Sequence, residues 1–349
     1  EKVVEALCEM YPDADIFTHV YDPAAISPTI NRHRVRTTFI SRLPKASRWY
    51  QRYLPLMPLA LEQLDLRSYD LVISSESGPA KGFVVSPGTL HVCYCHTPMR
   101  YLWDMYHDYL ASAGRVTRWA MRPVMHYLRM WDLLSAFRVD HFVANSRYVA
   151  RRIAKHYRRE SDVVHPPVSV DDFRIADSVD DYYLMVGQLV GYKRTEIAVE
   201  AFNRMGRKLI IIGEGEQYDS LARLAGPTVQ LMGRQPFEVI RSHYSKCRAL
   251  IFPGVEDFGI VPVEAMASGR PVIAYRQGGA LETVEEGKTG LFFDMQNADA
   301  LIDAVKRYEA RADEFNPAQI RAHAESFQVA RFKREMQSVI DRLMREQCA

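Results

Sequence analysis

The chain has 349 residues, of which 48% are hydrophobic and 25% charged, and its formal net charge is +2. This length exceeds one ordinary core and predicts two domains of about 150 to 180 residues each. The near-neutral charge and the lack of a recognisable binding module argue against nucleic acid as a partner. The most apolar stretch, Tyr53–Leu61, is shorter than the roughly 18 residues of a membrane span and is interrupted by proline. A soluble or peripheral protein is therefore expected.

Neither the cysteines nor the closely spaced acids predict a metal site. The five cysteines lack zinc-like spacing, and their odd number without a signal peptide favours a reducing cytosol. Cys93 and Cys95 alternate along an expected strand, so core packing is the better interpretation. Asp13 and Asp15 have the spacing of a metal-binding pair, but they precede a hydrophobic strand, which favours a turn. We therefore expect no metal and no cofactor.

The first half of the chain alternates expected helices with short apolar runs. Residues Glu1–Tyr11 have a helical pattern without a preceding strand or a capping residue, so the chain is expected to begin in mid-fold. Short apolar runs follow, which we interpret as strands: Asp15–Val20, Val35–Ile40, Leu71–Ser75, His91–His96 and His141–Asn145. This alternation predicts a parallel α/β sheet.

Positive charge is concentrated in the first half of the chain. Residues 1–175 contain 23 Lys and Arg against 18 Asp and Glu, whereas the remainder contains 22 against 25. Two stretches, Pro23–Leu61 and Tyr109–Trp131, contain no acidic residue and interleave arginines with aromatic and methionine side chains. We interpret them as surfaces for anionic lipid head groups or a lipid-linked phosphate. The alternative is a solvated arginine face with the aromatic side chains in the core.

His96 stands at the end of an expected strand in the first half. Because α/β sheets bind ligands at the carboxyl ends of their strands, His96 is a candidate for a cleft between two domains. A single histidine is more often structural, and that alternative stays open on position alone.

A change of pattern near the middle of the chain predicts a boundary between domains. The segment His165-Pro-Pro-Val, followed by several aspartates up to Asp181, breaks the periodicity and is typical of an interdomain linker, with a second domain after it. Apolar runs then predict strands at Tyr182–Leu189, Lys208–Ile212, Val229–Met232, Ala249–Phe252, Pro271–Tyr275 and Leu291–Phe293. Helical patterns cover Thr195–Met205, Glu216–Leu224, Phe237–Cys247, Val261–Ala267 and Ala298–Arg311. This half is expected to be a regular Rossmann-like unit.

Glycine-containing loops follow several of these expected strands. The first, residues 187–194, precedes a helix, so Lys193 can reach a phosphate at the helix entrance. The second, Gly213-Glu-Gly-Glu216, gives only a weak dinucleotide signal, because the third glycine of that fingerprint would fall at Tyr218. The third begins at Gly278-Gly279, for which an ordinary strand-to-helix turn is the alternative.

The stretch Pro253–Gly269 carries two carboxylates across a junction between a strand and a helix. The helix is expected to start near Pro262, which suits a first helical position, so Glu256 falls in the loop and Glu264 in the first turn. A helix start concentrates unpaired N–H donors that can hold an anion, and a carboxylate can accept two hydrogen bonds from a sugar diol. The combination predicts a sugar nucleotide site. The alternative is that Glu264 only favours the helix dipole while Glu256 is solvated.

This pattern of two glutamates separated by seven residues, with Phe-Gly between them, resembles the signature of retaining glycosyltransferases of family 4. Their GT-B fold has two Rossmann-like domains facing a central cleft. The resemblance implies that Glu264 holds the donor ribose and that Glu256 lies by the transferred sugar. It also implies that backbone amides of Phe258, Gly259 and Ile260 contact sugar hydroxyls.

The resemblance extends to the other loops. It implies that Lys193 faces the diphosphate, that Gly213 and Glu214 lie beside the base, and that Gly278 and Gly279 face the donor phosphates. Where Gln188 stands, the family usually has an arginine, so one phosphate-binding cation is missing unless Arg194 replaces it.

His96 gains a role from the same resemblance. The following Thr97-Pro98 and the segment Tyr101–Asp104 resemble mannosyltransferase-like members, in which this histidine contacts the transferred sugar. The expected catalytic residues are therefore His96, Glu256 and Lys193.

These observations predict a retaining, metal-independent glycosyltransferase that moves a hexose from a nucleoside diphosphate sugar to a saccharide acceptor. Family similarity favours mannose from GDP-mannose, and a polyprenyl-diphosphate-linked acceptor at the cytoplasmic face of the membrane, in cell-surface polysaccharide synthesis. Alternatives are a nucleotide-sugar epimerase on the same fold, a non-catalytic sugar-nucleotide-binding protein and a peripheral membrane adaptor.

The expected domains are an acceptor-binding domain at 1–166, a donor-binding domain at 167–326 and a C-terminal helix at 327–349 that packs back on the first domain. Family members begin with a buried strand and a glycine-rich loop before the helix that opens this chain. The first domain is therefore expected to lack its first strand.

Overall fold

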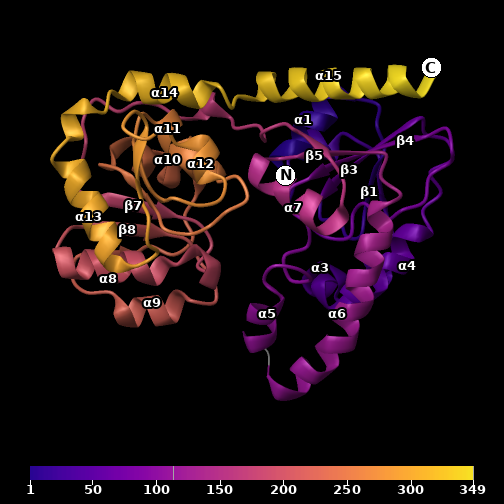
Figure 1. Cartoon of the computed structure of the whole chain (residues 1–349), viewed down its shortest axis with the longest axis horizontal. Coiled ribbons are helices and arrows are strands. Elements are labelled where there is room, and N and C mark those ends of the chain that lie inside the picture. Colours follow the sequence, from indigo (N-terminus) through magenta and orange to yellow (C-terminus); the bar gives the residue numbers. More distant parts are fainter. Residues whose placement is uncertain (113, 349) are drawn as a thin grey trace. The chain divides into compact units, whose positions relative to one another are not determined.

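A computed structural model describes residues 1–112 and 114–348 of the chain. They divide into two compact units, the first made of Glu1–His165 with the residues from Phe332 onward, and the second of Pro166–Arg331. Both units combine parallel β-sheet with helices (Figure 1). The expected α/β, GT-B-like composition is thus present in each half.

The second unit is built on a six-stranded parallel sheet in the order β12-β11-β10-β7-β8-β9. Its strands are β7 (Tyr183–Val186), β8 (Leu209–Ile212), β9 (Val229–Leu231), β10 (Leu250–Phe252), β11 (Val272–Tyr275) and β12 (Gly290–Phe293). Apart from β9, these runs are almost wholly buried, as expected for a sheet covered on both faces. Each expected strand of this half is therefore confirmed, with shorter bounds except for β12, which begins one residue earlier than expected.

Helices cover both faces of this sheet (Figure 1). They are α8 (Thr195–Met205), α9 (Tyr218–Leu224), α10 (Phe237–Lys246), α11 (Ile260–Ala267), α12 (Ala280–Thr283), α13 (Ala298–Glu309) and α14 (Pro317–Glu325). Helix α8 packs against α9 and α13, whereas α11 packs against α10 and α14. The strand order reverses direction at β7, so right-handed crossovers place α8 and α9 on one face of the sheet and α10 and α11 on the other.

Two details of the second unit correct the expectations. Helix α11 begins at Ile260 with Gly259 as its N-cap at φ +87°, so Pro262 is its third residue and Glu264 lies in the second turn, not the first. The expected linker is also part of the second unit, because Val168 and Phe173 are buried in its core. Periodicity missed this segment because it packs without forming a long helix or strand.

The first unit contains two separate parallel sheets among its described residues. One pairs β1 (Ile16–Thr18) with β2 (Val35–Thr37), and the other has the order β3 (Leu71–Glu76), β4 (Leu90–Cys95), β5 (His141–Ala144) and β6 (Ser161–Val163). Strand β6 was not expected, because a short run with two polar residues carries no apolar signal. Strand β4 is fully buried, and Cys93 and Cys95 pack in the core as expected.

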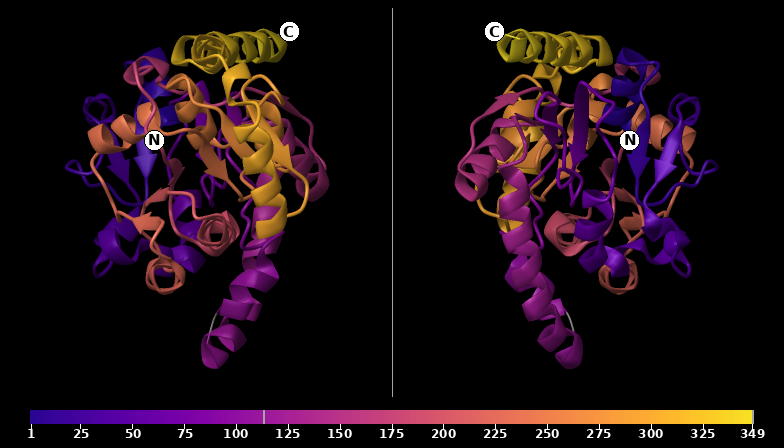
Figure 2. Two further views of the ribbon diagram at one scale, coloured as in Figure 1. Left: turned by 90° about the vertical axis from the view of Figure 1, so that its left-hand side faces the viewer. Right: turned by 90° about the vertical axis from the view of Figure 1, so that its right-hand side faces the viewer.

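The helices of the first unit are mostly short. They are α1 (Lys2–Met10), α2 (Pro28–Asn31), α3 (Ala46–Trp49), α4 (Met57–Glu62), α5 (Tyr106–Ser112), α6 (Arg115–Ala136) and α7 (Arg147–Tyr157). Helix α6 is the long exception, and its first half extends with α5 beyond the strands of this unit (Figures 1 and 2). Helix α15 (Val329–Cys348) follows the second unit, and its Phe332 packs edge-on to Tyr94 of the first, with ring centroids 5.6 Å apart.

A buried ionic cluster joins four elements of the first unit. The ammonium of Lys81 contacts Glu76 at 3.0 Å and also contacts Asp132, and all three side chains are inaccessible to solvent. Tyr157 and Trp103 donate hydrogen bonds to Asp132 at 2.9 and 2.7 Å. The cluster therefore ties β3 and the loop after it to α6 and α7.

None of the helices in the described residues combines the length and the apolar character that crossing a bilayer requires.

Candidate functional site

Four adjacent strands of the second unit end at one edge of the sheet, and the expected site residues lie in the loops that follow them. The strands are β11, β10, β7 and β8, which are parallel neighbours. Parallel strands present their carboxyl ends at the same edge, so these loops share one rim of the sheet. The structure thereby gathers the loops at residues 187–194, 213–216, 253–259 and 277–279.

Lys193 and Glu256 form an ion pair across two of these loops. Lys193 ends the short 3-10 helix η4 (Gly191–Lys193), and its ammonium contacts a carboxylate oxygen of Glu256. Their side chains are 12% and 18% exposed, so solvent still reaches both. A Cβ at Gly254 would lie 2.8 Å from the Cα of Lys193, so only glycine permits this approach of the loops. The pair is therefore fixed by backbone packing while remaining accessible.

The loop after β11 packs on the loop that carries Glu256. The backbone N–H of Gly279 donates to the carbonyl of Glu256 at 2.8 Å. A Cβ at Gly279 would lie 2.3 Å from Phe258, so any side chain there would separate the two loops. The ring of Phe258 is buried against Phe327, so this residue offers the rim its backbone and not its side chain.

The loop after β8 is held against the loop after β7 in the same way. A Cβ at Gly213 would lie 1.8 Å from the carbonyl oxygen of Gly187, and the backbone N–H of Leu189 donates to the backbone carbonyl of Glu214 at 2.9 Å. The Glu214 carboxylate faces solvent, where it pairs with Arg234 at 3.6 Å. The glycines thus serve close backbone approach, while Glu214 keeps an accessible carboxylate beside the rim.

Glu264 is positioned by a tyrosine that the sequence analysis did not identify. The Tyr244 hydroxyl on α10 donates to an oxygen of Glu264 at 2.9 Å. Burial, and then the negative charge of Glu264, raise the pKa of Tyr244 well above its usual value, so the hydroxyl remains a donor. Tyr244 continues the apolar face of its expected helix, which indicated a buried side chain, but periodicity could not reveal its partner.

Arg194 and Gln188 differ in how they are held. Arg194 adopts a left-handed conformation at φ 55° before α8, and its side chain pairs with Glu196 at 3.3 Å. Gln188 is exposed one residue after Gly187, whose position lies close to the Lys193 ammonium. The positive charge of Arg194 is thus partly offset by the carboxylate of Glu196 in the first turn of α8.

His96 belongs to the first unit and directly follows β4. Its Nε2 lies 2.9 Å from the Ser75 hydroxyl. Burial lowers the pKa of His96 to about 4. The imidazole is therefore neutral at physiological pH.

Asp15, the second residue of the acidic pair that precedes β1, has partners within the first unit. It lies 2.8 Å from Arg36 and accepts a hydrogen bond from Tyr69. Among the described residues, no three His, Cys, Asp or Glu side chains come together as metal ligands would.

The rim of the second unit therefore offers an accessible ammonium, two carboxylates and the N-terminus of α11. Such a set can hold an anion through its cation and N–H donors and can accept hydrogen bonds from hydroxyl groups. These binding groups match a ligand that carries both a phosphate and a sugar diol.

Family models and curated relatives that match this chain are glycosyltransferases. Residues 172–324 match the model of glycosyl transferases group 1, and residues 1–172 match that of glycosyltransferase family 4. The GDP-mannose-dependent alpha-(1-6)-phosphatidylinositol monomannoside mannosyltransferase of Mycobacterium tuberculosis is 35% identical over 231 residues, 56% of this chain and 59% of that protein. The O-antigen chain mannosyltransferase of Salmonella typhimurium is 27% identical over 217 residues, 56% of this chain and 62% of that protein. The matched region spans about three fifths of the length of each of these two relatives.

Solved structures share the fold. Sucrose-phosphate synthase from Thermosynechococcus elongatus superimposes with a TM-score of 0.71 at 19% identity, covering 98% of this chain and 92% of that one. Anabaena HepE in complex with UDP and glucose gives 0.70 at 14% identity, covering 97% and 95%. With family models matching both units and GT-B neighbours over nearly the whole chain, this protein belongs to the family 4 type of glycosyltransferases and has the GT-B fold.

Proposed function

We propose that the protein is a retaining glycosyltransferase that moves a hexose from a nucleoside diphosphate sugar to a saccharide acceptor. The observation that carries this proposal is the rim of the second unit, where the Lys193–Glu256 ion pair lies on glycine-packed loops and Glu264, in the second turn of α11, is held by Tyr244. The second unit is then the donor-binding domain and the first the acceptor-binding domain.

Each rim residue has a role in this proposal. Glu264, held by Tyr244, accepts hydrogen bonds from the donor ribose, and Lys193 binds the diphosphate. The ammonium has three N–H donors, so it can bind a phosphate oxygen while keeping one bond to Glu256. Glu256 and the backbone amides of Phe258, Gly259 and Ile260 then lie by the transferred sugar. Gly213 and Glu214 border the base, and Gly278 and Gly279 face the phosphates.

The reaction requires charge stabilisation more than proton transfer from the protein. In a front-face substitution the departing diphosphate takes the acceptor's proton, and Lys193 with the N-terminus of α11 stabilises the negative charge that develops. Arg194 and Gln188 border the same loop and support the phosphates less strongly. His96, neutral because of its lowered pKa, contacts the sugar as a hydrogen-bonding group and not as a cation.

Mannose from GDP-mannose is the favoured donor. Its support is that several relatives, at 24 to 35% identity, bear mannosyltransferase names. Three of these names include a lipid or an O-antigen chain, which favours a lipid-linked acceptor and a role in cell-surface polysaccharide synthesis.

An anionic membrane surface at the cytoplasmic face is the proposed location, and α6 supports it. This helix exposes an apolar stripe whose members are 49 to 77% accessible: Trp119, Tyr127, Met130, Leu134 and Phe137. Its neighbours Arg115 and Arg122 are exposed, and the stretch Tyr109–Trp131 has no acidic residue. An exposed apolar stripe flanked by arginine suits a helix lying in the interface of an anionic bilayer.

The test combines donor choice with stereochemistry. Thermal unfolding would be followed with GDP-, UDP- and ADP-sugars, and the anomer of any product would be read by proton NMR. We expect the greatest stabilisation by GDP-mannose and an α product from the α-linked donor. Turnover to an epimerised donor without acceptor would replace the proposal with the epimerase, and no stabilisation by any sugar nucleotide would reject it.

A further inference from the structure

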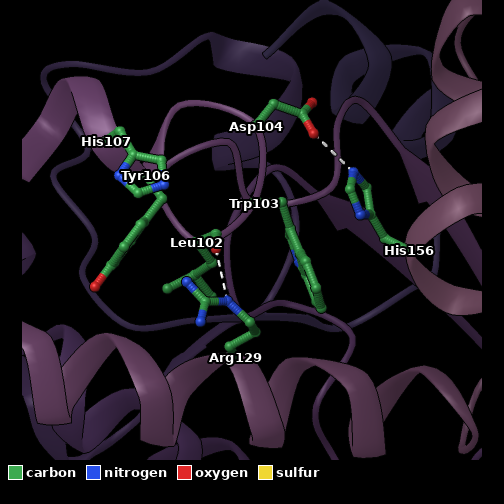
Figure 3. Close-up of a pocket in the computed structure, with 7 residues that line it drawn as sticks. All are labelled: Leu102, Trp103, Asp104, Tyr106, His107, Arg129 and His156. Atoms are coloured by element: carbon green, nitrogen blue, oxygen red, sulfur yellow. Dashed lines mark hydrogen bonds and ion pairs between the residues drawn. The ribbon is translucent and has the colours of Figure 1, made fainter.

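A cavity of about 360 Å³ lies between the segment after β4 and α6, wholly within the first unit. Figure 3 shows its lining: Leu102, Trp103, Asp104, Tyr106, His107, Arg129 and His156. None of these residues was assigned to the donor site. The cavity combines aromatic rings with several basic side chains and a single acid. The balance of these charges indicates which kind of ligand the cavity can bind.

Arg129 is the fixed cation of this cavity. Its Nε donates to the carbonyl of Leu102 at 2.8 Å, and its guanidinium lies over Tyr106 at 4.7 Å and Trp103 at 5.8 Å (Figure 3). Within residues 1–112 and 114–348, no carboxylate forms an ion pair with it. The two terminal nitrogens are therefore oriented by the protein but have no anionic partner there.

The one acidic side chain of the cavity, Asp104, already has basic partners. Asp104 pairs with Arg152 and accepts from the His156 imidazole at 2.7 Å. The hydrogen bond to His156 and the charge of Arg152 lower the pKa of Asp104, so it is a carboxylate whose charge is balanced by Arg152. His156 in turn stacks on Trp103 with ring centroids 4.7 Å apart. An anion beside Arg129 thus meets little net repulsion.

Further basic groups line the approach. His107 is exposed at the cavity, and its ring contacts Tyr106 with centroids 5.1 Å apart. On α6, His126 and Arg122 precede Arg129 by three and seven residues and therefore share its helix face. A guanidinium with a fixed fork, stacked on aromatic rings and unpaired by acid, is the arrangement that recognises phosphate oxygens.

We propose that this cavity binds a phosphate ester through Arg129 and His107. The inference goes beyond the proposed function, because it places a second anion site in the first unit. It does not depend on which sugar the second unit transfers. The ester comes either from a lipid head group, since Met130 of the exposed stripe is adjacent to Arg129, or from a soluble phosphate.

The test uses the full chain and glycerol 3-phosphate as the probe. Binding is followed through the imidazole proton signal of His107, assigned with His107→Ala, which reports on the cavity and not on the second unit. We expect saturable binding, a loss of affinity of about ten-fold or more in Arg129→Gln, as for charge-assisted hydrogen bonds, and no loss in Lys193→Gln. Arg129→Lys, which keeps the charge without the fork, should lose less.

Arg118→Gln is the matched control. Arg118 lies on the same helix and its Nε also donates to a backbone carbonyl at 2.8 Å, that of Leu110, but it does not line the cavity. Equal losses in both variants, or unchanged binding in a folded Arg129→Gln, would overturn the proposal, as would a His107 signal that does not respond to the ester.

Vesicles distinguish the two sources. Phosphatidylcholine vesicles with phosphatidic acid should displace glycerol 3-phosphate if the natural ligand is a lipid head group, while vesicles of phosphatidylcholine alone should not. Binding of the soluble ester without competition from either vesicle identifies a soluble phosphate as the ligand of the same cavity.

Discussion

Two lysines, one in each unit, pair with carboxylates and yet do different work. Lys81 is inaccessible to solvent, as are its partners Glu76 and Asp132, and the cluster is completed by tyrosine and tryptophan donors. Lys193 and Glu256 are 12% and 18% exposed on loops held by glycine. A fully enclosed, fully satisfied network holds elements together, whereas a pair at a sheet rim remains available to a ligand.

The largest test of this difference is to remove each ammonium. Lys81→Met leaves two buried carboxylates without their cation and should destabilise the first unit by about 3 to 5 kcal/mol. Lys193→Met should change stability by less than about 1 kcal/mol, because its partner keeps access to water, but should weaken donor binding. Hydrogen exchange on peptides from each unit would locate the loss.

A rescue variant sharpens the result. Adding Glu76→Gln and Asp132→Asn to Lys81→Met removes the stranded charges, so part of the stability should return. A Lys81→Met protein as stable as the parent would show that the cluster does not hold the first unit together.

Acid should also affect the stability of the two units differently, because the first contains one buried and two half-buried histidines whose pKa values are lowered. Burial lowers the pKa of His19 and His96 to about 4 and that of His91 to about 3. A lowered histidine pKa gives stability that is complete above the unfolded value of about 6.5 and is lost as the pH falls towards the folded value.

Glu76 acts in the opposite direction in the same range. Burial raises its pKa to about 7, an effect that Lys81 partly offsets and Asp132 adds to, so its contribution grows as the pH falls from 7 to 4.5. Because three histidines lose stability and one carboxyl gains it, unfolding takes up about two net protons in this range. The free energy of unfolding should therefore fall by about 2 to 3 kcal/mol one unit below pH 6.5. Thermal scans from pH 7 to 5 should show the first unit melting earlier, and equal acid sensitivity of both units would contradict this.

Binding of the donor is expected to depend on residues of the second unit, and Glu264 tests this. Glu264→Ala removes the acceptor proposed for the ribose diol and should weaken nucleoside diphosphate binding by about 1.5 to 3 kcal/mol, or about 10- to 150-fold. Calorimetric titration would measure it, with Glu200→Ala on the exposed face of α8 as the control. Unchanged affinity in Glu264→Ala would remove the main support for the donor site.

Tyr244→Phe gives a graded version of that experiment. It removes only the hydroxyl that positions Glu264 at 2.9 Å, so we expect a smaller loss, about 0.5 to 1.5 kcal/mol. If positioning is its role, the combined variant with Glu264→Ala should lose no more than Glu264→Ala alone.

The two units also differ in how far the sequence predicts them. In the second, buried parallel strands produce continuous apolar runs, and short loops keep each motif next to its strand, so strands, most helices and the residues of the rim were predicted. The first turn of α11 was misplaced, because Gly259 and not Pro262 fixes where the helix begins, and the segment expected to be a linker contributes Val168 and Phe173 to the core.

In the first unit the decisive contacts are distant in sequence. Lys81 meets Asp132 after 51 residues, and Arg129 meets Leu102 after 27. Periodicity reports which face of an element is buried but not which element covers it. The cluster and the cavity beside α6 therefore became visible only in three dimensions, while the arginine-rich pattern had indicated a surface for anionic lipid head groups or a lipid-linked phosphate.

The smallest expected effect concerns Gln188, at the position where the family usually carries an arginine. Gln188 is exposed, and the neighbouring Gly187 lies close to the Lys193 ammonium, so a guanidinium there could join Lys193 on the diphosphate. Because the site is open to water, Gln188→Arg should tighten donor binding by no more than about 1 kcal/mol. Gln188→Lys should gain less, since it adds the charge without the planar fork, and added salt should reduce both gains. Titration of the three proteins at two salt concentrations would separate charge from geometry. Weaker binding by Gln188→Arg would mean that the amide itself contacts the donor, and the second unit would then hold its phosphates with Lys193 and backbone donors alone.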